Sequence, residues 1–153
     1  MAVQMKVKFL TFDPSSNGFA LLLSDLENKH ALPIWIGPFE ANAIAMKLKN
    51  VHSHRPMTHD LIRNILKVFH AEIAKIEVVD LRDYTYYALI HIKVDGKEIS
   101  IDSRPSDAIA VALWAGAPIY VTEEVLSKAK TIKLDQLEQW LESLNPEDFK
   151  HKA

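Results

Sequence analysis

The sequence predicts a single α+β domain, with a mixed, largely antiparallel sheet and helices inserted between groups of strands. Its 153 residues, 48% hydrophobic and 25% charged, describe one ordinary globular domain. β-prone runs occupy residues 3–36 and 73–102, and segments with helical periodicity lie between these two regions and beyond the second. Strand groups separated by helices in this way are typical of α+β domains.

The first group of strands is predicted from three apolar, β-prone runs: Val3–Phe12, Phe19–Leu26 and Ala31–Ile36. The turn-forming residues 13–18 separate the first two runs, so these two runs are expected to form a hairpin. Gly37-Pro38 ends the third strand, and a helix follows to about Asn50.

The next helix is predicted to begin near Thr58 and to continue to about His70. Its apolar half comprises Leu61, Ile62, Ile65, Leu66, Val68 and Phe69, and a basic line on the other half comprises His59, Arg63, Lys67 and His70. We expect the apolar half to face the core and the basic line to face away from it. The basic line is either simply solvated or contacts a phosphate backbone.

The strands expected at 73–82 and 85–102 include the turn signal Asp95-Gly96, which predicts a two-residue hairpin. A type I′ loop there places His91 opposite Ser100 and Ile90 opposite Ile101, with the isoleucines on the buried side. The same register sets His91 diagonally beside Asp102 on the polar side. Such a pair can take part in acid–base chemistry, although adjacent polar residues are also common on exposed sheet faces.

The polar segment 102–107 (Asp-Ser-Arg-Pro-Ser-Asp) leads into a helix that has no polar side chain from Ala108 to Ala115. A helix that is apolar all round is buried, so only its polar start can meet a water-soluble ligand. Arg104 is the predicted cap and Pro105 the first helical residue. The free N–H groups of the first turn and the guanidinium suit a phosphate. The simpler alternative is that Ser106 and Asp107 only satisfy those N–H groups.

Gly116 is expected to end this helix, and a short core strand follows at 117–121. Thr122 then caps a helix that has two glutamates in its first turn. A last helix, Leu134–Leu144, carries an apolar stripe that docks either on the body of the domain or on another subunit. We divide the chain into a domain at residues 1–128 and a C-terminal amphipathic helix with a polar tail at 129–153.

Composition narrows the classes of function. The formal net charge of −2 argues mildly against a dedicated nucleic-acid binder, but residues 47–75 hold six Lys or Arg against two acids, enough for a local positive patch. The chain has no cysteine, no signal-peptide pattern and no membrane-length apolar run, so we expect a cytoplasmic protein without a membrane partner. The histidines of His52-Ser53-His54 and His59 lack a supporting carboxylate or thiol, which makes a zinc site a weak interpretation.

Three motifs carry a resemblance to a known family. They are Leu32-Pro33-Ile34-Trp35-Ile36-Gly37 with Glu40-Ala41, Arg55-Pro56-Met57-Thr58-His59-Asp60-Leu61, and Ile101–Ala110 continuing through Gly116-Ala117-Pro118-Ile119. In this order and spacing the chain resembles the bifunctional nuclease family from about Lys6 to Val125. The resemblance implies a nuclease that acts on both DNA and RNA.

The residues and the resemblance together suggest hydrolysis of phosphodiester bonds. The expected catalytic residues are Asp102, Asp107, Glu40, His59 and Asp60, and the expected phosphate-binding residues are Arg104, Ser103, Ser106, Arg63 and Lys67. Asp102 and Asp107 are the first candidates to bind Mg²⁺ or Mn²⁺, and His59 or His91 would transfer protons. The expected partners are DNA or RNA and further copies of the chain.

A different class of function is also compatible with the same residues. In a non-catalytic binding or assembly module, Glu40 and Arg104 would form a buried pair, and Gly37, Pro105 and Gly116 would only fix the path of the chain. Phosphate contact would make oligonucleotide affinity fall steeply with salt, so a salt titration separates the two hypotheses.

Overall fold

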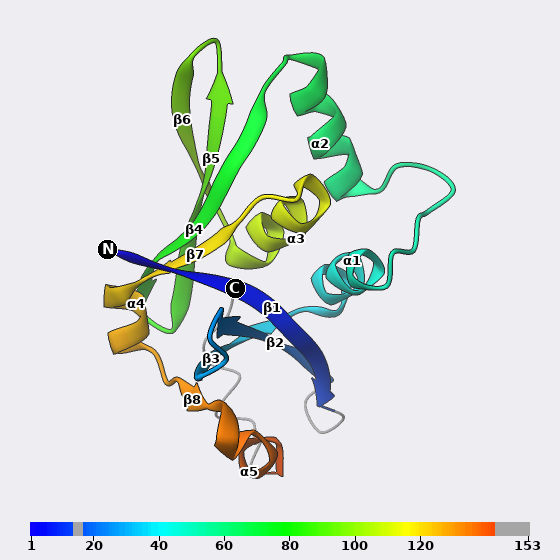
Figure 1. Ribbon diagram of the computed structural model, residues 1–153. Coiled ribbons are helices and arrows are strands. Elements are labelled where there is room, and N and C mark those ends of the chain that lie inside the picture. Colours follow the sequence, from blue (N-terminus) through cyan, green and yellow to red (C-terminus); the bar gives the residue numbers. More distant parts are fainter. Residues whose placement is uncertain (14–16, 143–153) are drawn as a thin grey trace.

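The computed structural model describes residues 1–13 and 17–142, which form one mixed sheet and the helices around it (Figure 1). The strands are β1 (Ala2–Asp13), β2 (Gly18–Asp25), β3 (His30–Ile36), β4 (Glu72–Arg82), β5 (Thr85–Val94), β6 (Lys97–Ser103), β7 (Ile119–Thr122) and β8 (Ile132–Lys133). The helices are α1 (Pro38–Leu48), α2 (Thr58–Val68), α3 (Pro105–Ala115), α4 (Glu123–Lys128) and α5 (Leu137–Glu142), with a 3-10 turn, η1, at Leu134–Gln136. The predicted α+β class is confirmed.

The sheet runs in the order β6-β5-β4-β7-β1-β2-β3-β8, and each neighbouring pair is antiparallel except the parallel pair β4–β7. The helices α1, α2 and α3 lie on one side of it (Figure 1). Helix α3 packs against α1, α2, β4 and β5. Residues 108–112 of this helix are buried as its sequence predicts, whereas Leu113 and Trp114 are half-buried and Ala115 is exposed. The polar start of α3 therefore lies near helices α1 and α2, which precede it by many residues in the sequence.

The hairpin of β1 and β2 forms as predicted, while residues 14–16 of its expected turn lie outside the described ranges. A register shift between Val7 and Phe9 interrupts the pairing. An extra residue in one strand inverts the alternation of side chains. For this reason Val3 and Met5 before the bulge and Leu10 after it all pack against the same core.

The hairpin of β5 and β6 has the predicted register, with His91 opposite Ser100 and Ile90 opposite Ile101. Ile90 and Ile92 are buried on the side that faces the helices. Because side chains alternate along a strand, His91 lies on the opposite face of the sheet.

The apolar stripe of the C-terminal segment packs on the body of the domain, which is one of the two positions expected from the sequence. Leu134, Leu137 and Trp140 pack against a second, smaller core cluster, and the Trp140 ring lies 6.1 Å from that of Trp35. Strand β8 pairs with β3 and so extends the sheet to residue 133. The division of the chain near residue 128 stays a prediction, and residues 143–153 of the expected helix and tail lie outside the described ranges. Within those ranges, no helix has the length and apolarity that crossing a membrane requires.

Helix α2 corrects one expectation from the sequence. Its apolar half does not face the core, and none of its residues is buried. Leu61 is 53% exposed and Ile65 is 48% exposed, whereas the side chain of His59, expected on a solvent-facing line, is only 13% exposed. The helix rests on the body through the boundary between its two halves, where Leu66 packs against the core. Periodicity defined the two halves correctly but not which of them meets the domain.

Candidate active site

The start of α3 has the local structure that its sequence predicts. Arg104 precedes a proline and is extended, with φ −68° and ψ 143°, and it occupies the N-cap position. Pro105 is the first helical residue, so Asp107 falls at the third position. At the far end Gly116 adopts the left-handed conformation, with φ 69°, that commonly ends a helix.

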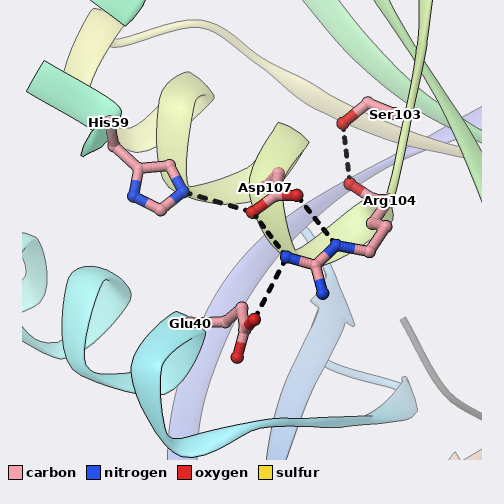
Figure 2. A network of polar contacts seen from close by, with 5 residues as sticks. All are labelled: Glu40, His59, Ser103, Arg104 and Asp107. Atoms are coloured by element: carbon pink, nitrogen blue, oxygen red, sulfur yellow. Dashed lines mark hydrogen bonds and ion pairs between the residues drawn. The ribbon is translucent and has the colours of Figure 1, made fainter. Parts of the chain in front are cut away.

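Arg104 lies between two carboxylates that come from distant parts of the chain (Figure 2). Its Nε donates to Asp107 Oδ2 at 2.9 Å and its Nη2 donates to Asp107 Oδ1 at 3.1 Å. The same Nη2 donates to Glu40 Oε1 at 3.1 Å. Asp107 also contacts His59, whose Nε2 lies 3.3 Å from Oδ1. The network therefore joins α1, α2 and the start of α3.

The guanidinium of Arg104 is fixed but still open to solvent. Its side chain is 55% exposed, against 18% for Glu40 and 33% for Asp107. Hydrogen bonding and charge from Asp107, and then from Glu40, raise the pKa of Arg104 above its ordinary value, so the group stays charged. Its bonds within the described chain use Nε and Nη2, while Nη1 forms none there (Figure 2). Two N–H donors of a rigidly held cation thus remain available to a ligand.

Gly37 explains the position of Glu40. A Cβ atom placed on Gly37 would lie only 2.5 Å from Glu40 Oε2, a distance that real Cβ contacts do not show. The carboxylate of Glu40 therefore packs directly over the backbone of the residue that caps α1. The sequence placed Gly37-Pro38 between a strand and a helix, but nothing in it indicates this contact.

A cavity of about 460 Å³ lies beside the network, between α2 and the β5–β6 hairpin. Its polar end is formed by Thr58, His59, Asp102, Ser103, Arg104 and Asp107. Its apolar wall is formed by Ile62, Leu66, Ile90, Ile92, Ile101 and Val111. The sequence assigned the isoleucines of this wall to the core, so the cavity itself could not have been found from the sequence.

The structure brings together four of the residues expected in the site: Glu40, His59, Arg104 and Asp107. Asp102 lines the cavity but is not part of the hydrogen-bonded network. Ser103 Oγ donates to the carbonyl oxygen of Arg104 at 2.9 Å. Two other expected residues, Ser106 for phosphate binding and Asp60 for catalysis, are not part of the network.

Ser106 is completely buried, so its hydroxyl is not accessible to a phosphate. Asp60 Oδ2 accepts the backbone N–H of Met57 at 2.8 Å and closes the first turn of α2, which gives this carboxylate a structural task. Arg63 and Lys67 line a different cavity, of about 330 Å³, together with Ala71 and Ile73. These positions are therefore separate from the Arg104 network.

His91 does not pair with Asp102, and this expectation was wrong. Its Nε2 lies 3.0 Å from Glu77 Oε1, and its Nδ1 lies 3.0 Å from Ser100 Oγ and 3.4 Å from Glu98 Oε1. Both ring nitrogens are thus engaged on the sheet face that points away from α3. His91 therefore cannot transfer protons at the Arg104 network.

The network does not fit a divalent metal ion. Such ions take several oxygen ligands around one point. Here the Arg104 guanidinium occupies the space between the Glu40 and Asp107 carboxylates, and Asp102 is not part of this network. Across the described residues no three His, Asp or Glu side chains converge to hold an ion. The binding of Mg²⁺ or Mn²⁺ that the sequence suggests stays a prediction.

The fold and the network define an α+β domain with an arginine-centred, solvent-accessible polar site, and comparison with known proteins assigns it to a family. The family model for the bifunctional nuclease domain matches residues 21–133, so the chain belongs to that family. Uncharacterised proteins from two strains of Mycobacterium tuberculosis are 33% identical to this chain, over 96% of it and 98% of their own length. Bifunctional nuclease 1 of Oryza sativa subsp. indica is 24% identical over 61% of this chain and 29% of the rice protein.

Proposed function

We propose that this protein hydrolyses phosphodiester bonds of DNA and RNA, with Arg104 binding the phosphate and His59 acting as general base. The observation that carries the proposal is the half-exposed guanidinium of Arg104. Two carboxylates hold it in place, two of its N–H donors remain open, and a histidine–aspartate pair lies beside it. A family of nucleases and the matching plant relatives support the same class of substrate.

In this proposal each side chain has a role that its contacts support. Asp107 accepts from Nε2 of His59 and leaves Nδ1 as the nitrogen that takes up a proton. Nδ1 removes that proton from water, or from a ribose 2′-hydroxyl in RNA, as the oxygen attacks phosphorus. The bond from phosphorus to the leaving oxygen then breaks, and solvent protonates that oxygen. Arg104 stabilises the negative charge that accumulates on the phosphoryl oxygens.

The proposal is tested with fluorescent single-stranded DNA and RNA oligonucleotides. His59→Gln and Asp107→Asn should each lower kcat/KM by about 10² to 10⁴-fold, because they remove or misorient the base. His30→Gln is the matched control, since His30 is exposed at the start of β3 and lies outside the network, and it should cleave at the wild-type rate. If all variants and the wild type cleave equally, the activity comes from a contaminant or another site, and the proposal is wrong.

Chelation tests the role of metal separately. Because the carboxylates of the site are occupied by Arg104, we expect cleavage to continue in excess EDTA after exhaustive dialysis. Activity that disappears in EDTA and returns with Mg²⁺ or Mn²⁺, but not with Ca²⁺, would contradict the metal-free step and would favour the metal-assisted mechanism expected from the sequence.

A second candidate function is the non-catalytic module, which the observed ion pair of Glu40 and Arg104 favours. On that hypothesis Arg104 only clamps α1 to α3, and Arg104→Gln would destabilise the fold without changing the binding of nucleic acid. If Arg104 binds phosphate as proposed, Arg104→Gln weakens oligonucleotide binding and reduces the salt dependence of that binding, because one phosphate contact is lost. A cytoplasmic location, like the nucleic-acid partner, is part of this proposal.

A further inference from the structure

A groove outside the Arg104 site lies between α1 and the β1–β2 hairpin (Figure 1) and has a volume of about 690 Å³. It shares no lining residue with the cavity beside Arg104. On the α1 side it extends from Pro38 to Lys49, roughly 16 Å at ~1.5 Å per helical residue. Its volume lies within the range of about 300–1,000 Å³ that is typical of small-molecule sites.

The walls of this groove are apolar. On the α1 side Ala41 and Ala45 have small side chains, and Ala41, which is 2% exposed, forms the floor. The hairpin contributes Leu10, Phe12 and Phe19, and the rings of the two phenylalanines lie 5.0 Å apart. Phe12 is 46% exposed, so an aromatic ring of this wall remains accessible to a ligand.

Two lysines lie at the rim of the groove. Lys8 is the extra residue of the bulge in β1, and a bulge commonly re-aims a side chain next to a functional site. Lys49 is the C-cap residue of α1. Both lysines are exposed, neither forms an ion pair with another described residue, and no described Asp or Glu lines the groove. The groove therefore combines an apolar interior with two positive charges that lack a counterion in the described chain.

The lysines and the aromatic rings lie at different ends of the two walls. Phe19 pairs with the last residue of β3, and Pro38 begins α1 two residues after it. Lys49 lies at the opposite end of α1 from Pro38. On the other wall, Lys8 lies four residues before Phe12, which is the cross-strand partner of Phe19. This separation of charge from apolar surface suits an amphiphilic ligand.

We propose that the groove binds one molecule of an amphiphilic carboxylate of the fatty-acid class. The alkyl chain lies between α1 and the hairpin, and the carboxylate accepts hydrogen bonds from Lys8 and Lys49. Burial of the chain supplies most of the binding free energy, and the lysines select an anion. This site is independent of the proposed nuclease activity.

Other ligands fit the groove less well. Asn42 is the one described lining residue with an uncharged polar side chain, so a nucleotide would bury its base and ribose without replacing their hydrogen bonds to water. The surface of a bilayer cannot reach the buried floor at Ala41, whereas a single alkyl chain can.

The test is isothermal titration calorimetry of the full chain with dodecanoate below its micelle concentration. Wild type should bind one molecule per chain. Dodecyltrimethylammonium, which has the same alkyl chain and the opposite charge, should bind at least about tenfold more weakly. No saturable binding of dodecanoate, or equal affinity for the two ions, overturns the proposal. Binding of the chain to anionic vesicles but not to monomeric dodecanoate would assign the groove to a membrane surface and would equally overturn it.

Variants locate the site. Lys8→Gln/Lys49→Gln should weaken dodecanoate binding by about five- to tenfold, because two exposed ion pairs are lost. The matched control Lys6→Gln/Lys97→Gln changes two exposed lysines outside the groove and should bind like wild type. Ala45→Trp fills the groove and should abolish binding. Unchanged affinity in the Lys8 and Lys49 double variant contradicts the proposal.

A photoreactive dodecanoate with a diazirine at the end of its chain covers the case in which Ala45→Trp does not fold. After irradiation and proteolysis of the wild type, the label should appear in residues 8–12 and 38–49, and excess unlabelled dodecanoate should prevent it. Label concentrated on the exposed apolar side chains of α2, or spread evenly over the chain, would show that the groove is not the site.

Discussion

The contact between Gly37 and Glu40 gives the sharpest test of the site's geometry. In Gly37→Ala the new methyl group would lie 2.5 Å from Glu40 Oε2. The carboxylate has to move by roughly 1 Å to restore an ordinary contact of about 3.5 Å. Gly37 itself has φ −78°, which alanine adopts without strain, so the backbone need not change. The substitution therefore displaces one side chain and with it the bond from Glu40 to Arg104.

The expected loss of unfolding free energy follows from the exposed fractions of the Glu40 and Arg104 side chains. Glu40 is 18% exposed and Arg104 is 55% exposed, so solvent screening leaves the pair worth only ~1 kcal/mol. Alanine is also a poorer N-cap than glycine, by ~0.5–1 kcal/mol. Gly37→Ala should then cost about 1.5–2 kcal/mol of unfolding free energy. Glu40→Ala alone should cost ~1 kcal/mol.

Urea unfolding of a double-mutant cycle separates these two contributions. In a Glu40→Ala background the methyl group of Ala at position 37 has nothing to displace, so Gly37→Ala should cost only the capping term of about 0.5–1 kcal/mol. We expect a coupling energy of ~1 kcal/mol, well above the error of such cycles. The same cost of Gly37→Ala in both backgrounds would show that Glu40 does not pack over Gly37, and the arrangement of the site would be wrong.

Three further predictions concern stability. Burial raises the pKa of Tyr86 to about 12, so the unfolded chain ionises from its ordinary pKa near 10 while the native state keeps the proton. Stability should be intact below pH 10 and fall by up to about 3 kcal/mol as the pH rises to 12, and this fall should be smaller in Tyr86→Phe but unchanged in the exposed control Tyr84→Phe. Ser106→Ala should be neutral or stabilise by about 1 kcal/mol in urea, because the buried hydroxyl has no hydrogen-bond partner in the described chain; a loss above 1 kcal/mol would reveal a hidden partner. Gly116→Ala should lower the thermal midpoint at a cost of about 1 kcal/mol, since its φ of +69° disfavours a side chain although there is space for one; no effect would mean that α3 ends differently.

Features that depend on neighbouring residues could be predicted from the sequence. The Asp95-Gly96 turn fixed the register of β5 and β6, because a two-residue loop leaves only one pairing. Proline and glycine likewise fixed both ends of α3, since Pro105 restricts Arg104 and Gly116 tolerates a left-handed backbone. In each case the cause lies within a few residues of its effect.

Features that depend on packing could not be predicted in this way. The contact of His59 with Asp107 spans 48 positions and forms only because α2 crosses the start of α3. Asp60 has the same side chain as Asp107, but it accepts the backbone N–H of Met57. Residue type alone could therefore not distinguish the carboxylate of the network, Asp107, from the capping carboxylate, Asp60. His91 was assigned to Asp102 by strand register alone, whereas Glu77 of β4, which no local pattern relates to it, is its partner.

The contact of His59 with Asp107 fixes which side of α2 is exposed. His59 and the exposed apolar residues Leu61 and Ile65 lie on different sides of this helix. A rotation that buried Leu61 would carry His59 away from Asp107, so the apolar side stays outside as long as the site is intact. Leu61→Lys should therefore keep the wild-type rate of oligonucleotide cleavage, because it changes the exposed side of α2 and removes no contact of His59.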